Sequence, residues 1–277
     1  MIELQPYPNG RCSGQSRARQ QAVFRGRGSG QSRARQQAVS PYVGELLKKC
    51  TNVLCALVFA CALVFPVWPQ VGAPGTHPVT GREYARPMSA DGADWLSRRE
   101  RDEEEQPRLA IDALNIPKGA TVADIGAGSG YITALLARRV GPGGKVYAND
   151  IQVRMLDLLR RYITQQKLTN VEPVLGTIDD PKLPANIIDL ALMVDVYHEF
   201  SEPQKMLRGI RAALKADGRM ALIEYRGEDP TVPIRPEHKM TVVQVRAEIE
   251  PEGYRFVRTI ETLPRQHIII FVKQSGK

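Results

Sequence analysis

The chain has 277 residues, of which 43% are hydrophobic, which suits one domain of ordinary size with additional sequence. Its net charge of +8 comes almost entirely from the start of the chain. Residues 1–50 hold nine Lys or Arg and two Asp or Glu, whereas residues 74–277 hold 29 basic and 28 acidic residues. The near-neutral main part argues against nucleic acid as a partner, and the absence of cysteine after residue 61 excludes thiol nucleophiles and zinc thiolates there.

The first 49 residues are a predicted disordered basic leader of low complexity. The ten residues GQSRARQQAV occur at 14–23 and again at 30–39. This sequence is rich in Arg, Gln and Gly and has almost nothing apolar to bury, so it cannot form a packed core. Two interpretations stay open, a wrongly assigned start of the chain and a basic tail that binds RNA or acidic lipid.

Residues 50–73 are predicted to be a signal peptide or a membrane anchor. The apolar run Val53–Phe65 follows Lys48 and Lys49 and is 13 residues long. That is short for a membrane span of about 20 residues and matches a signal-peptide core. A buried apolar helix is the alternative, but no amphipathic period supports it. We therefore expect an exported protein or membrane association through residues 50–71, with a cytoplasmic protein as the alternative.

Residues 74–106 are predicted to be an N-terminal extension that folds over a bound ligand as a lid. Residues 74–90 are rich in Pro and Gly and should run extended over the surface. A helix is expected over Asp91–Arg101. We interpret the charged stretch Arg98–Glu105 as a solvated helix face.

Residues 107–277 alternate between strand and helix patterns. The expected strands are 121–125, 145–149, 171–175, 187–194, 219–225, 254–262 and 267–273, and the expected helices are 109–114, 131–140, 153–166, 203–214 and 241–250. Such alternation argues for parallel strands with helices on both faces. The predicted fold is α/β, a Rossmann-like seven-stranded doubly wound sheet that ends in an antiparallel hairpin.

The stretch from Val122 to Gly130 carries the first functional signal, a strand that runs into a glycine-rich turn and then a helix. Glycines there let backbone approach a ligand closely, and the helix start supplies free N–H groups. The spacing is G-x-G-x-G, and Tyr131 stands where a dinucleotide fingerprint has its last glycine, which disfavours an NAD-dependent dehydrogenase. Asp124 adds an acidic group that attracts a cation.

Acidic residues follow the second and third strands. Asp150 comes about 20 residues after the glycines, where a carboxylate accepts hydrogen bonds from ribose hydroxyls. It is also placed to cap the helix over 153–166, and both roles can hold together. Asp179 or Asp180 is a candidate acceptor for an adenine amino group.

Five segments carry a resemblance that covers roughly residues 107–226: VADIGAGSG, VYAND, DDPKLP, DLALMVDVYHEF and LKADGRMALIEYR. Together they resemble the class I S-adenosylmethionine (SAM)-dependent methyltransferases, nearest to the quinone-biosynthesis and arsenite methyltransferase types. The resemblance implies SAM as cofactor, with Asp124, Gly126 and Gly128 on its methionine side, Asp150 at the ribose and Asp179 at the adenine. Thr177 departs from the group, which often has an acidic residue there. The predicted cofactor set also includes Gly130, Ile151 and Asp195.

The acceptor side is predicted at the ends of the fourth, fifth and seventh strands, which the resemblance places side by side. The candidate catalytic residues are His198, Glu199 and His267, and the candidate substrate-binding residues are Tyr197, Glu224, Arg226 and His238. His198 suits a general base near neutral pH, and Glu199 suits a group that orients it or binds a cationic acceptor.

Three interpretations of the histidines stay open: a base and orienting cluster, a metal site and structural hydrogen bonding. No H-x-x-x-H or C-x-x-C spacing supports a metal, so none is predicted. The leading function is methyl transfer from SAM to a small molecule, without nucleic acid as a partner. A SAM-binding regulatory protein without catalysis is the alternative.

Overall fold

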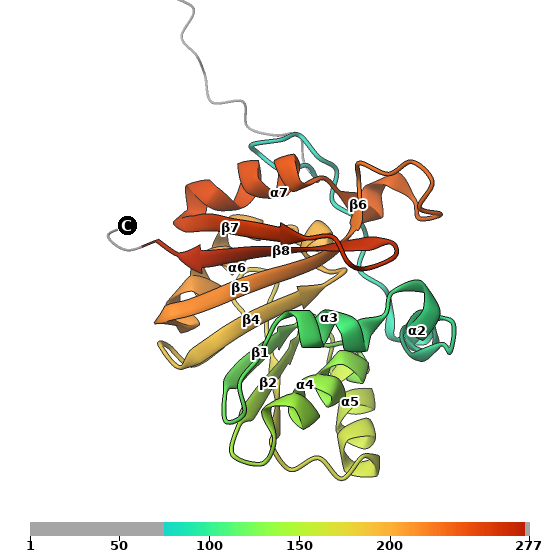
Figure 1. The fold of residues 1–277 in the computed structure, drawn as a ribbon, viewed down its shortest axis with the longest axis vertical. Helices are drawn as coiled ribbons and strands as arrows, with labels where there is room; N and C mark the ends of the chain where they lie inside the picture. The colour runs from blue at the N-terminus through green and yellow to red at the C-terminus, as the bar shows by residue number, and fades with distance from the viewer. Residues whose placement is uncertain (1–74, 275–277) are drawn as a thin grey trace, which may run out of the picture. The chain divides into compact units, whose positions relative to one another are not determined.

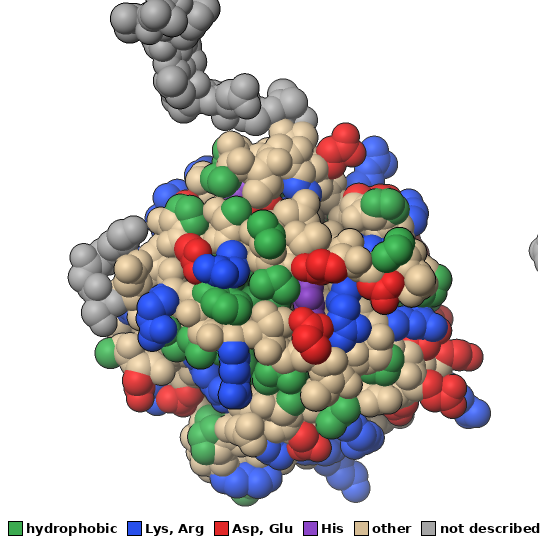
Figure 2. Space-filling view, turned by 45° about the horizontal axis from the view of Figure 1, so that its top comes forward, with side chains coloured by type: hydrophobic (Ala, Val, Ile, Leu, Met, Phe, Trp, Pro, Cys, Tyr) green, Lys and Arg blue, Asp and Glu red, His purple; other side chains and the backbone are tan. Residues whose placement is uncertain are grey.

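The computed structural model describes residues 75–274 (Figure 1). The predicted leader, residues 1–49, and the predicted signal peptide or anchor, residues 50–73, lie outside the described residues. Within the described part, no helix is both long enough and apolar enough to span a membrane. On the face shown in Figure 2, basic and acidic side chains are interspersed, as the nearly equal numbers of the two in residues 74–277 would suggest.

One mixed sheet forms the centre of the fold, with strand order β3-β2-β1-β4-β5-β8-β7. Its strands are β1 (Thr121–Ile125), β2 (Lys145–Asp150), β3 (Val171–Leu175), β4 (Ile188–Val194), β5 (Leu214–Arg226), β7 (Tyr254–Ile260) and β8 (Gln266–Lys273). The first five run parallel, and β8 is antiparallel to both β5 and β7. The predicted Rossmann-like sheet with a C-terminal antiparallel hairpin is confirmed.

An eighth strand, β6 (Lys239–Met240), pairs with β5 and was not predicted, because two residues carry no periodicity. The predicted start of the fifth strand at residue 219 also differs from β5, which begins at Leu214. The reason is a register irregularity: Ile188 pairs with Leu214, but Leu190 already pairs with Arg219. Residues 215–218 therefore bulge before regular pairing resumes.

Helices cover both faces of the sheet (Figure 1). The α-helices are α2 (Arg101–Glu104), α3 (Pro107–Ala113), α4 (Tyr131–Val140), α5 (Val153–Gln165), α6 (Pro203–Ala213) and α7 (Val242–Ile249), and the 3-10 helices are η1 (Ala90–Ser97), η2 (Tyr197–Glu199), η3 (Pro236–His238) and η4 (Glu250–Glu252). Helices α3, α4 and α5 lie on one face, and α6 and α7 lie on the other. This is the doubly wound arrangement.

The core consists of two apolar layers separated by the sheet. Val122 of β1 packs in the layer of α3 and α4, whereas its neighbour Ala123 packs in the layer of α6 and α7. In β4, likewise, Leu192 packs in the layer of α3 and α4, and its neighbour Met193 packs in the layer of α6 and α7. Successive side chains of a strand point to opposite faces, so a strand covered on both sides is apolar at every position. This explains the apolar run from Leu190 to Val194 in β4, which follows the partly buried Asp189 near the start of the strand.

The N-terminal extension differs from its prediction in two respects. The helix expected over 91–101 divides into η1 and the one-turn α2, because the backbone of Arg98 is extended, with φ −60° and ψ 148°. The solvated helix face was also wrong for Arg101 and Glu105, whose exposed fractions are 5% and 2%. They form a buried ion pair, and the Tyr225 hydroxyl donates to Glu105 at 2.9 Å.

Candidate cofactor and acceptor site

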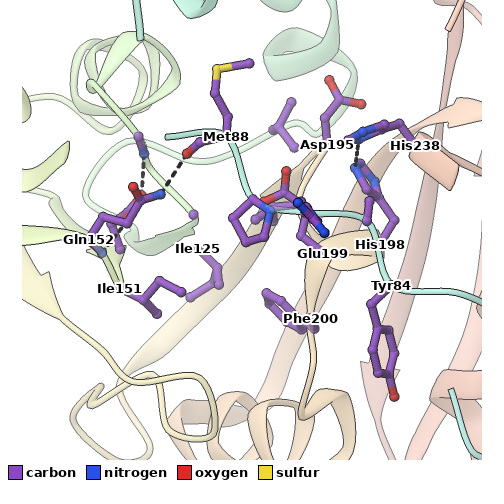
Figure 3. Close-up of a pocket in the computed structure, with 18 of the residues that line it drawn as sticks. Tyr84, Met88, Ile125, Ile151, Gln152, Asp195, His198, Glu199, Phe200 and His238 are labelled. Atoms are coloured by element: carbon purple, nitrogen blue, oxygen red, sulfur yellow. Dashed lines mark hydrogen bonds between the residues drawn. The ribbon is translucent and has the colours of Figure 1, made fainter. Parts of the chain in front are cut away.

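A cavity of about 900 Å³ lies at the carboxyl ends of β1, β2, β4 and β5 (Figure 3). This is the edge where ligands bind in open α/β sheets. The glycine turn after β1 and the end of β2 form one part of its wall. The loop after β4 and the segment before β6 form another, and residues 84–88, 95, 96 and 101 of the N-terminal extension also line it.

The glycine turn brings backbone to the cavity wall. Gly126 and Gly128 have φ values of +72° and +53°, in the left-handed region that favours glycine. A Cβ at Gly126 would overlap Cγ2 of Val196, and one at Gly128 would lie 2.8 Å from Cδ1 of Leu96. The close packing of the turn against both neighbours therefore requires glycine at these two positions.

Asp150 ends β2 and fixes the glycine turn. Its Oδ2 accepts a hydrogen bond from the Gly128 N–H at 2.9 Å, and its Oδ1 accepts one from the Gln152 N–H at 2.8 Å. Burial raises the pKa of Asp150, while these N–H donors oppose the rise. Each carboxylate oxygen has a further lone pair, so Asp150 can accept from a ligand as well. The predicted capping role of Asp150 is wrong, because the N-cap of α5 is Gln152 and no side chain caps this helix.

Three predicted cofactor residues lie off the cavity wall. Asp124 is buried behind the turn and accepts a hydrogen bond from the Thr133 hydroxyl at 2.6 Å. Gly130 precedes α4 with φ +96° and packs near Leu159. Asp179 is bonded to the Thr177 hydroxyl at 2.7 Å. Ile151, in contrast, lines the cavity, and beyond β3 the lining residues are Thr177 and Ile178 rather than Asp179.

His198 and Glu224 form a buried pair at the opposite part of the wall. His198 Nδ1 lies 2.6 Å from Glu224 Oε2, and Glu224 Oε1 accepts the Tyr197 N–H at 3.0 Å. A carboxylate only accepts, so the His198 proton is assigned to Nδ1 and the lone pair to Nε2. Burial acts to lower the pKa of His198, but the Glu224 carboxylate outweighs it, and the net shift is upward.

His238 and Glu199 complete this end of the cavity. His198 Nε2 lies 3.1 Å from His238 Nδ1, and Figure 3 shows the two rings facing each other beside Asp195. Glu199 also lines the cavity, and burial raises its pKa to about 7. The structure thus brings together side chains from the loop after β4, from β5 and from η3.

The other predicted acceptor residues do not line the cavity. Arg226 turns into the β7–β8 connection, where it donates to Glu261 at 2.8 Å and to the Leu263 carbonyl at 2.7 Å. His267 is 1% exposed and pairs with Glu224 across the β5–β8 ladder. Tyr197 is fully buried against Phe200. Glu224 does not line the cavity itself, but it contacts the lining residue His198.

Sequence reasoning placed Arg101 in the predicted lid but missed that it is a buried lining residue paired with Glu105. Its Nη1 donates to the Leu96 carbonyl at 2.6 Å, and its guanidinium lies 5.2 Å from the centre of the Tyr131 ring. The signal was present as a charge pair four residues apart, Arg101 and Glu105. The interpretation as a solvated face obscured it.

Asp195 was predicted for the cofactor set and lines the cavity. Its backbone is in the left-handed region, with φ +52°. The amide of Gln266 donates to its Oδ2 at 2.6 Å. Its Oδ1 is enclosed and has no hydrogen-bond partner within the described residues.

Residues 116–252 match the family model described as a methyltransferase domain. The chain is 32% identical over 119 residues to a ubiquinone/menaquinone biosynthesis C-methyltransferase of Escherichia fergusonii, which is 43% of this chain and 47% of that protein. It is 30% identical over 128 residues to the enzyme of the same name from Hahella chejuensis, 46% and 51% of the two chains. A SAM-dependent methyltransferase structure from Aquifex aeolicus matches with a TM-score of 0.63 and 27% identity, over 67% of this chain and 98% of that one.

The chain belongs to the class I SAM-dependent methyltransferases. It spans about half the length of the curated relatives it matches. The family's methyl donor is SAM, and the residues at the cavity fit it. Asp150 offers acceptor sites to ribose hydroxyls, Asp195 adds a carboxyl group to the wall, and Arg101 offers a guanidinium to a carboxylate.

Proposed function

We propose that this chain transfers a methyl group from SAM to a small-molecule acceptor. The observation that supports this most is that one cavity holds both halves of the site. Gly126, Gly128 and Asp150 line one part, and His198 and Glu199 line another. Its volume of about 900 Å³ is at the upper end of the range for small-molecule sites, which suits two ligands side by side.

Residues at different parts of the cavity wall have different roles. SAM, when bound, would supply a methyl group on a sulfonium; the acceptor atom would bond to the methyl carbon in line as the carbon–sulfur bond breaks, and the neutral thioether would leave. Asp150, Asp195 and Arg101 line the cavity and would hold the donor by its polar groups, beside the acceptor end. His198 and Glu199 hold the acceptor there. Fixing both reactants in one geometry removes much of the entropic barrier to such a displacement.

We propose an acceptor with an apolar, ring-sized body and a polar group at the reacting end. Met88, Trp95, Phe200 and Ile234 line the cavity, and Trp95 is 43% exposed, so an apolar ligand can cover it. The polar end faces His198 and Glu199. The relatives named for ubiquinone and menaquinone biosynthesis support this acceptor class.

The first test is isothermal titration of the full chain with SAM and, as a control, with NAD. We expect SAM to bind and NAD not to bind, because Tyr131 stands at the last glycine position of the dinucleotide motif. A panel of phenols and quinols is then incubated with methyl-labelled SAM, and label transfer is measured. A folded chain that binds no SAM would overturn the proposal. SAM binding without transfer to any acceptor class would favour the regulatory alternative.

A further inference from the structure

We infer that His198, His238 and Glu199 form a binding site for a divalent transition metal at the acceptor end of the cavity. Each residue offers one ligand atom, and these atoms all lie within 4.8 Å of one another. Two imidazoles and one carboxylate are a donor set typical of catalytic zinc and non-haem iron sites. The metal would bind and activate the acceptor, and this role rests on the proposed function.

The spacing of the two imidazole nitrogens fits a shared ion. His198 Nε2 and His238 Nδ1 are 3.1 Å apart. In a tetrahedral site with metal–nitrogen distances of about 2.0–2.1 Å, two donor atoms lie about 3.3 Å apart. The two ring planes are 82° apart, in an edge-to-face arrangement. A small movement of either ring would admit an ion between them.

His198 has the outer partner that a metal-binding histidine needs. Its Nδ1 lies 2.6 Å from the Glu224 carboxylate, which leaves the lone pair on Nε2 for the metal. Most metal-binding histidines donate their second ring N–H to a carboxylate, a carbonyl or water in this way. Glu224 is itself fixed, because it is fully buried and accepts the Tyr197 N–H. The orientation of His198 is therefore set before any ion binds.

The charges around the cluster favour a cation. The carboxylates of Glu224, Glu199 and Asp195 all act electrostatically on His198. Oδ1 of Asp195 has no hydrogen-bond partner among residues 75–274. Arg101 is paired with Glu105, whereas Arg235 brings one positive charge to the cluster, with Nη2 3.4 Å from Nε2 of His238. A divalent ion would offset this local excess of negative charge.

Three protein ligands leave at least one coordination position for the acceptor, as in catalytic metal sites. The cluster lines the cavity, so the open position faces the bound acceptor. A metal there binds an oxygen ligand and lowers the pKa of a coordinated hydroxyl group. We therefore expect the acceptor to be a phenol or an enol. Its oxyanion would bind the metal, and the same oxyanion would activate the ring or enol carbon next to it.

The test is a titration of the chelator-stripped full chain with Co²⁺, followed by visible absorption, and then displacement by Zn²⁺. We compare the wild type with His238→Ala, Glu199→Gln and the control Glu202→Gln, a partly exposed neighbour outside the cluster. The four cysteines before residue 62 are unchanged in all of them, so metal bound by thiols stays constant. Circular dichroism establishes that each variant is folded.

We expect the wild type and Glu202→Gln to bind one Co²⁺ more than His238→Ala does, and Glu199→Gln to bind it at least about tenfold more weakly. Identical titrations of the wild type and His238→Ala would overturn the metal site and leave the two histidines as a hydrogen-bonded pair. The proposed function is tested separately, by titration of the chain with SAM. Metal binding without SAM binding would overturn the methyltransferase proposal and leave the metal site standing.

Discussion

The guanidinium of Arg101 and the carboxylate of Glu105 form a buried ion pair across one helical turn, with Nε 2.7 Å from Oε2. Glu105 also accepts hydrogen bonds from Arg98 at 2.7 Å and from the Tyr225 hydroxyl at 2.9 Å. It thus joins the N-terminal extension to β5. Because Arg101 lines the cavity, the same carboxylate positions a cation at the cofactor end.

Replacing Glu105 by Gln should destabilise the fold strongly. The buried Arg101 would lose its charge partner, and breaking a buried pair in this way costs about 3–5 kcal/mol. The matched control is Glu103→Gln in the same helical turn, where the side chain is exposed and a change within about 0.5 kcal/mol is expected. Urea unfolding of the two variants measures the difference. Equal stabilities would show that the pair contributes nothing.

The fold was predictable from the sequence because each element carries a strong local pattern. The alternation of β-branched and apolar runs with amphipathic helices placed β1, β2, β3 and β4 within one residue of their observed ends. The two-residue β6 and the bulge before Arg219 were not predictable, because both depend on pairing with distant strands. The buried ion pair of Arg101 and Glu105 was missed for a similar reason. Its partner Tyr225 is 120 residues away from Glu105.

Gly126→Ala should destabilise the protein, whereas Gly143→Ala should not. Alanine at 126 would have to adopt φ +72° and would overlap Val196, whereas a Cβ at 143 meets nothing within 4 Å. The left-handed backbone costs about 1–2 kcal/mol and overpacking about 1–3 kcal/mol, so a loss of roughly 2–5 kcal/mol is expected. Urea titration measures it. Similar stability of the two variants would show that the turn tolerates a side chain.

Asp150→Asn should weaken SAM binding more than it weakens the fold. The amide keeps the shape of the side chain but turns one acceptor into a donor, which cannot serve both the backbone N–H groups and a ribose hydroxyl. Hydrogen bonds to a charged group contribute about 1.5–3 kcal/mol, so at least a tenfold rise in Kd is expected. Asp157→Asn, on the exposed side of α5, is the control. Calorimetric titration that gives the wild-type Kd for Asp150→Asn would contradict the ribose role.

The candidate site was predictable only in part. Asp150 and the glycine turn follow strand ends within one short segment, so their convergence can be inferred from order alone. The contact between His198 and His238 joins residues 40 positions apart through a loop whose course no local pattern reveals. Arg226 and His267 stand at the predicted strand ends. Their side chains lie away from the cavity, Arg226 in the β7–β8 turn and His267 in the core.

The buried Asp124 should make stability depend on pH in the acidic range. Burial raises its pKa from 3.8 to about 6, despite the hydrogen bond from Thr133. Between these two pH values the folded state holds more protons than the unfolded state, so stability falls as the pH rises through this window. Asp124→Asn removes the titration. The free energy of unfolding of the wild type, relative to this variant, should therefore drop by about 2 kcal/mol between pH 4 and pH 7. Urea unfolding of both proteins across this range measures the drop. A constant difference would show that Asp124 ionises in the folded protein as it does in the unfolded chain.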